Sequence, residues 1–136
     1  RFPQGSLCQN HGLLMFDVSF DELLMLLPEL SEKYEGFLSA VNRCDGVPEA
    51  VLSACRIRVR QIHGLEADSQ PKAFSKAEEV ALTIAEKMPF QHHELLDEEV
   101  QKVKELFGDD GCVALLTAVA FFDATSRLEL TFARGS

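Results

Sequence analysis

Three side chains that could do acid–base chemistry lie close together at the end of a predicted helix: His63, Glu66 and Asp68. A histidine and two carboxylates can transfer protons or hold a divalent metal ion. A structural alternative is that His63 complements the negative end of the helix dipole while the two acids are solvated. We favour this alternative, because a helix-end imidazole is common on dipole grounds alone, and we keep the three residues as the candidate catalytic set.

Two other combinations are less suited to chemistry. Cys55 and His63 are eight positions apart on one predicted helix, which places them about 12 Å apart along its axis, whereas a nucleophile and its base must approach to about 3 Å. Cys55 is therefore predicted to lie in the core. His92 and His93 are adjacent on a predicted loop and lack further ligands at a metal-binding spacing. We predict that they are surface residues, and we expect no metal and no cofactor.

Charged residues on two of the helices are expected to be structural. Arg56, Arg58 and Arg60 lie at alternate positions, about 200° apart on a helical wheel, so they cannot form one anion clamp. At least one of them should pair with an acid. Asp123 and Arg127 are four positions apart on an otherwise apolar helix, which predicts an ion pair that is buried and fixes the helix register.

Helices are expected to position all of these side chains. Pro28 should kink the first helical run or begin a second helix there. Ser75 and Glu78 form a capping box, and Gly64 and Gly108 are suited to end helices. The helices are predicted at Phe20–Asn42, Pro48–His63, Ser75–Met88, Asp97–Phe107 and Asp110–Phe132. The sequence has no run of alternating apolar and polar residues long enough to indicate a β-strand. We therefore predict one all-α domain over residues 1–136, with an irregular segment over about residues 1–18.

The composition limits the classes of partner. The 136 residues are 46% hydrophobic, enough for a core, and carry a net charge of −9. This acidity argues against nucleic acid and against an anionic membrane surface as partners.

The last predicted helix is apolar nearly all round, which predicts burial on several sides. Asp123, Arg127 and Glu129 interrupt it before the ~20 apolar residues that a membrane span needs.

Cysteine usage and the first residues point to one compartment. The cysteines are scattered and include no C-x-x-C pair: Cys8, Cys44, Cys55 and Cys112. Reduced, buried thiols of a cytoplasmic protein are the favoured interpretation. The stretch RFPQGSLCQN has no apolar core of a secretory signal. We therefore expect the protein to be cytoplasmic.

The order of these pieces resembles the alkylhydroperoxidase D-like branch of the carboxymuconolactone decarboxylase family. RIRVRQIHGLEAD resembles the family's L-R-x-A-Q-[IL]-N-G-C-x-x-C segment, and FSKAEEVALTIAEKM, residues 74–88, resembles its F-[ST]-x-x-E-R-A-A-L helix. LDEEVQKVKELFGDDGCVALLTAVAFFDATSRL resembles its C-terminal helix pair. The matching positions of the first segment are Arg58, Gln61, Ile62 and Gly64. The resemblance covers residues 51–128 and implies an alkylhydroperoxidase D-like helical bundle.

The departures from that family bear directly on activity. The alignment places Leu65 and Asp68 at the two redox cysteines, Lys72 near the motif histidine and Ser53 near the upstream acid. Disulfide chemistry needs a thiolate and a resolving thiol within reach. The peroxidase mechanism therefore does not carry over. Only SQPKA separates Asp68 from Phe74, where the family has a further helix, so this connection is either truncated or lacks residues.

Two functions follow as expectations. In the first, the chain is nominally a peroxidase (peroxiredoxin-type) family member whose activity would use other residues in a pocket near His63 to Asp68. In the second, it is a non-catalytic scaffold or small-molecule-binding protein that retains the fold. A homo-oligomer, at least a dimer, is expected in either case, because the final helix and the run LLMLLPEL offer more apolar surface than one chain can cover.

Overall fold

The computed structural model describes residues 20–43, 46–66 and 75–134, without the side chains of the first two and last two of these. No strand occurs within them, which confirms the all-α prediction. The predicted irregular segment at about residues 1–18 lies outside the described residues. The elements are α2 (Phe20–Leu24), α3 (Pro28–Asn42), α4 (Glu49–Ile62), α5 (Lys76–Gln91), the 3-10 turn η2 (His92–Glu94) and α6 (Asp97–Arg134).

The first predicted helix is divided at the proline. α2 ends at Leu24, and a turn follows in which the backbone N–H of Leu27 donates to the carbonyl of Leu24. α3 then begins at Pro28, which occupies its first turn, where the missing N–H has no helical partner to lose. The expected break at Pro28 is confirmed.

α4 and α5 keep most of their predicted boundaries. Ser75 caps α5, because its hydroxyl oxygen accepts a hydrogen bond from the backbone N–H of Glu78 at 3.1 Å. The predicted end of α5 at Met88 is wrong, since the helix continues through Pro89 to Gln91. Pro89 is buried, and Arg127 of α6 donates to its carbonyl oxygen at 2.8 Å, so tertiary contacts hold this turn despite the absent N–H.

A polar contact joins the C-terminal part of α5 to the first turn of α6. The Glu99 carboxylate accepts a hydrogen bond from the backbone N–H of Leu96 at 3.0 Å and pairs with Lys87 Nζ at 2.9 Å. The Leu96 hydrogen bond first, and then the lysine, holds the pKa of Glu99 below its ordinary value. This contact closes the turn that brings α6 back toward α5.

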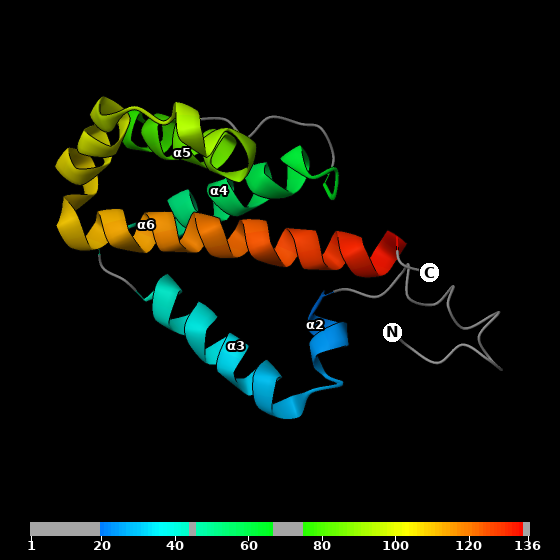
Figure 1. The fold of residues 1–136 in the computed structure, drawn as a ribbon. Coiled ribbons are helices and arrows are strands. Elements are labelled where there is room, and N and C mark those ends of the chain that lie inside the picture. Colours follow the sequence, from blue (N-terminus) through cyan, green and yellow to red (C-terminus); the bar gives the residue numbers. More distant parts are fainter. Residues whose placement is uncertain (1–19, 44–45, 67–74, 135–136) are drawn as a thin grey trace, which may run out of the picture.

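The two predicted C-terminal helices run as one element that changes direction at Gly108. Gly108 has φ 78° and ψ 172°, a conformation that only glycine adopts without strain. Figure 1 shows the change of direction between the yellow and orange parts of α6. Just beyond it the chain approaches the α3–α4 connection so closely that a Cβ on Gly46 would lie 2.8 Å from the Cα of Gly111.

The core lies between α4, α5 and α6. Its most enclosed members come from all three helices, and they include Leu52, Cys55, Val59, Ile84, Val103, Leu115 and Val119. α3 has no buried residue and lies on the side of α6 away from α5 (Figure 1). It contacts α6 through rings, since the centroids of Phe37 and Phe121 are 4.6 Å apart. α6 is thus buried along one stripe and touched by α3 on another, while Val113 and Leu128 stay exposed.

By length and composition alone, α6 could cross a membrane, and it is the one such helix among the described residues. The core helix of a water-soluble protein passes the same test. Leu115, Ala118 and Val119 of α6 belong to the core cluster formed with α4 and α5. The expectation of no membrane contact stays a prediction.

Candidate functional site

His63 lies at the C-terminal end of α4, in the position that the sequence predicts. It is the last residue before Gly64, whose φ of 79° ends the helix with a left-handed turn. The backbone N–H of Leu65 donates to the carbonyl of Arg60 at 2.8 Å and satisfies one of the helix's last carbonyls. This turn holds the backbone of His63 and turns its side chain toward α6.

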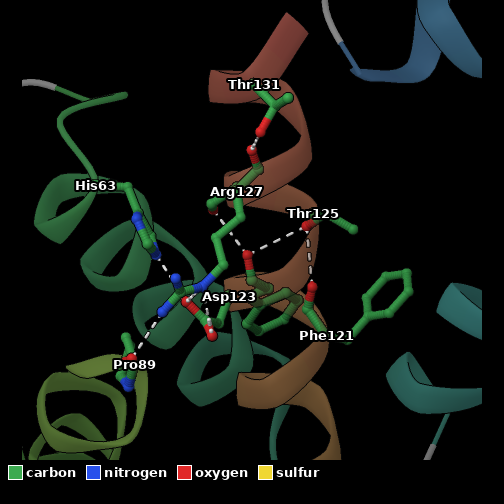
Figure 2. A network of polar contacts seen from close by, with 9 residues as sticks. His63, Pro89, Phe121, Asp123, Thr125, Arg127 and Thr131 are labelled. Atoms are coloured by element: carbon green, nitrogen blue, oxygen red, sulfur yellow. Dashed lines mark hydrogen bonds and ion pairs between the residues drawn. The ribbon is translucent and has the colours of Figure 1, made fainter. Parts of the chain in front are cut away.

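The imidazole of His63 is bound to a residue 60 positions further along the chain. His63 Nε2 lies 2.7 Å from Asp123 Oδ1, and because an ionised carboxylate can only accept, the ring donates its Nε2–H. Arg127 Nε lies 3.1 Å from the same oxygen, which confirms the predicted i,i+4 pair. Arg127 Nη2 also donates to the Pro89 carbonyl oxygen at 2.8 Å. Figure 2 shows the His63 ring, the Asp123 carboxylate and the Arg127 guanidinium meeting at one place, with dashed lines for their contacts.

These four groups, His63, Asp123, Arg127 and the Pro89 carbonyl, form what we call the polar clamp, because they join α4, α5 and α6. Only 3% of the His63 side chain is exposed, whereas Asp123 is 21% and Arg127 49% exposed. The prediction that the Asp123–Arg127 pair is buried is therefore wrong. The enclosed member of the polar clamp is His63. The reason is that Arg127 extends along the surface to reach Pro89.

Aromatic packing closes one side of the polar clamp. The ring centroids of His63 and Phe90 are 5.1 Å apart, and the Arg127 guanidinium carbon lies 4.8 Å from the Phe90 centroid. An open pocket of about 540 Å³ lies beside these groups, also lined by Ile62, Leu130 and Thr131. The Thr131 hydroxyl donates to the carbonyl of Arg127 in its own helix (Figure 2).

Of the candidate catalytic set, the structure describes His63 and Glu66, and each of them pairs with a different residue. Glu66 pairs instead with Arg60 Nε at 3.0 Å, and Asp68 lies outside the described residues. Arg60 also binds Glu129 of α6 at 2.8 Å. Glu129 is the main cause that raises the pKa of Arg60 above its ordinary value. Glu66 therefore takes part in an ion-pair network with Arg60 and Glu129.

The α4 arginines behave as predicted. Arg58 Nε pairs with Glu86 of α5 at 2.9 Å, while Arg60 reaches α6. Because the two side chains leave opposite faces of α4, each tethers a different neighbouring helix. The expectation that at least one arginine pairs with an acid is confirmed.

Neither described thiol is open to substrate. Cys55 has no exposed surface, and burial raises the pKa of its thiol to about 12, as expected for a core position. Cys112 is also buried. Cys8 and Cys44 lie outside the described residues, as does Lys72, whereas Leu65 and Ser53, at two of the family's catalytic positions, are described.

The histidine pair is at the surface, as predicted. His92 and His93 lie in η2 with their rings edge to face, and His93 is 3.7 Å from Glu94. Within the described ranges, no group of three or more His, Cys, Asp and Glu side chains could hold a metal ion.

Asp123 is the member of the polar clamp whose contacts the sequence did not fully reveal. Its pairing with Arg127 was predictable from local spacing, but its contact with His63 joins residues 60 positions apart. The available signal was an acid that interrupts a long apolar stretch of the predicted helix, because such a group needs polar partners when it is enclosed. The comparison with protein-family models finds no match for this chain, and neither do the searches of curated proteins and of solved structures.

Proposed function

We propose that this chain is a non-catalytic helical scaffold or binding protein of the alkylhydroperoxidase D-like type, and not a thiol peroxidase. The observation that carries the proposal is the state of His63, around which the candidate catalytic set was built. Its imidazole is 3% exposed and donates to Asp123 at 2.7 Å, so its described contacts hold helices together. A base that acts on a substrate must instead come within hydrogen-bond reach of it.

The thiols support the same conclusion. A peroxidase of this type begins with attack by a thiolate, and the thiolate fraction depends on the thiol pKa and on access. The pKa of Cys55 near 12 leaves almost no thiolate at neutral pH, and the core encloses its sulfur. Leu65, at the first redox position of the resemblance, cannot supply a thiol.

Peroxide turnover tests this proposal. Purified protein is mixed with an alkyl hydroperoxide and a dithiol reductant, and peroxide loss is compared with the same mixture lacking protein. We expect no protein-dependent loss. Reductant-dependent turnover that disappears in Cys55→Ala would overturn the proposal, and turnover that disappears in Cys8→Ala or Cys44→Ala would do the same.

An acid–base enzyme is the second candidate, and the pocket beside the polar clamp favours it. A His–Asp pair next to a pocket of about 540 Å³ is an arrangement that general bases use. Variants distinguish the two candidates. If the pair is structural, His63→Gln lowers stability and no reaction is lost; if it is catalytic, a substrate found by screening loses turnover in His63→Gln while substrate binding persists.

Self-association is the third part of the proposal, with a second copy of the chain as the partner. The turn before α3 and the first turn of α3 expose four large apolar side chains: Met25 (70%), Leu26 (61%), Leu27 (58%) and Leu30 (51%). A contiguous apolar surface of this kind is unfavourable on a soluble monomer. The net charge of −9 disfavours an anionic membrane as the cover.

Light scattering tests self-association at micromolar concentration. We expect a mass of at least twice the 15.1 kDa of one chain. Leu26→Glu should shift the population toward monomer, whereas Leu106→Glu, at another exposed leucine, should not. A mass near 15.1 kDa across a dilution series would contradict this part of the proposal.

A further inference from the structure

A second pocket lies between α3, α4 and the middle of α6. Its volume is about 500 Å³, within the ~300–1,000 Å³ range of small-molecule sites. Leu38 of α3, Leu52 of α4 and Phe122 of α6 supply an apolar floor, and Glu49, Ser53 and Arg56 supply a polar row along α4. We call this space the α3–α4 pocket.

Arg56 is the unusual member of the polar row. Its neighbours Arg58 and Arg60 pair with carboxylates of α5 and α6. Among the described residues Arg56 makes no ion pair and no hydrogen bond, although the chain carries a net charge of −9 and acids are abundant. A guanidinium with five donors is therefore available at the mouth of an apolar-floored pocket.

The spacing along α4 restricts the ligand further. Ser53 is three positions before Arg56, so both side chains lie on one face and can bind the same anionic group. Glu49 is seven positions before Arg56, about 10.5 Å along the helix axis. Its negative charge at the other end of the row opposes a second anionic group on the ligand. The row thus favours one anionic group over two.

We propose that the α3–α4 pocket binds an amphipathic monocarboxylate, such as a medium-chain fatty acid. The carboxylate accepts hydrogen bonds from the Arg56 guanidinium and the Ser53 hydroxyl. The hydrocarbon chain lies against Leu38, Leu52 and Phe122. α3 has no buried residue of its own, and a bound chain would give Leu38 a larger apolar contact. The inference gives a ligand class to the non-catalytic binding function proposed above. It rests on that function only because it assumes that the ligand is bound and not converted.

Titration calorimetry with matched eight-carbon probes tests the ligand class. Octanoate should bind at one molecule per chain. Octanol lacks the charge, and suberate carries a second carboxylate that would lie near Glu49, so each should bind at least about tenfold more weakly. High salt should weaken octanoate and leave octanol unchanged. Octanol binding as tightly as octanoate, or no octanoate binding at all, would overturn the proposal.

Paired charge-removing variants test the location. Arg56→Gln should weaken octanoate about tenfold, because one charge-assisted contact is lost. Lys104→Gln removes the same charge from an exposed site on α6 outside this pocket, and it should leave binding unchanged. If both variants weaken binding equally, the effect comes from the change in net charge and not from a contact in the pocket, and the assigned site is refuted. Arg56 is exposed and unpaired among the described residues, so its variant should keep the wild-type circular dichroism spectrum.

The peroxide assay separates this inference from the proposed function. Failure of octanoate binding with no peroxide turnover removes the ligand assignment and leaves the non-catalytic scaffold intact. Peroxide turnover in a protein that binds octanoate at Arg56 removes the non-catalytic function and leaves the ligand site intact.

Discussion

Replacing Asp123 with alanine removes the acceptor that His63 and Arg127 share. The carboxylate lies 2.7 Å from His63 Nε2 and 3.1 Å from Arg127 Nε, so both donors lose a partner at once. Because the polar clamp joins α4 to α6, we expect the substitution to destabilise the whole fold and not only the surroundings of residue 123.

The magnitude follows from the exposure of the two donors. His63 is 3% exposed, so its Nε2–H would be left in the interior without a partner, which costs about 1–3 kcal/mol. Arg127 is 49% exposed and keeps its hydrogen bond to Pro89, so its share is that of a surface pair, about 0–1 kcal/mol. Asp123→Ala should therefore lower the free energy of unfolding by about 1–4 kcal/mol. Asp123→Asn keeps an acceptor oxygen for His63 and should lose about half as much.

Urea unfolding followed by far-UV circular dichroism measures the effect. The midpoint should fall with an unchanged slope, since a stability change alone leaves the slope constant. Glu105→Ala removes an exposed acid from the same helix and should stay within about 0.5 kcal/mol of wild type. If Asp123→Ala is as stable as Glu105→Ala, the polar clamp does not hold the helices together.

Three further predictions concern the frame around the site. Gly46→Ala should destabilise by about 1–3 kcal/mol, because its Cβ would meet Gly111 at 2.8 Å; thermal unfolding measures this, and an unchanged melting temperature would contradict it. The folded-state pKa of Glu99 is lowered, first by the Leu96 N–H, so its stabilisation is present above about pH 4.5 and is lost as pH falls through that lowered pKa. The stability difference between wild type and Glu99→Gln should therefore shrink below pH 4.5, and a constant difference would contradict a lowered pKa of Glu99. Cys55 should react with iodoacetamide only after unfolding, as peptide mapping would show; rapid native labelling would contradict its burial.

The sequence predicted the helices well wherever a local signal marks a boundary. Pro28 begins α3, Ser75 caps α5, and Gly108 marks the change of direction in α6, each by chemistry within a few residues. The end of α5 was wrong because local rules stop a helix before proline, whereas burial of Pro89 and its bond from Arg127 carry the helix onward. These are tertiary effects that a local pattern does not contain.

The candidate site shows the same limit. His63 was identified at the helix end from its position before a glycine, but its partner was sought among nearby acids. Glu66 pairs with Arg60 instead, and Arg60 also binds Glu129, which lies 69 positions further along the chain. The contact of His63 with Asp123 likewise depends on how α4 and α6 cross. Periodicity identifies faces of helices, and it does not specify which faces meet.

Chemical modification of histidines tests whether the His63 imidazole is enclosed in the polar clamp and unavailable to a substrate. The native protein is treated with diethyl pyrocarbonate, and each histidine is followed by mass spectrometry of its peptide. His93, whose side chain is 69% exposed, should be modified readily, while His63 should react only after unfolding or in Asp123→Ala. If His63 in the native protein is modified as fast as His93, the imidazole is not enclosed, and an accessible base at this site is favoured.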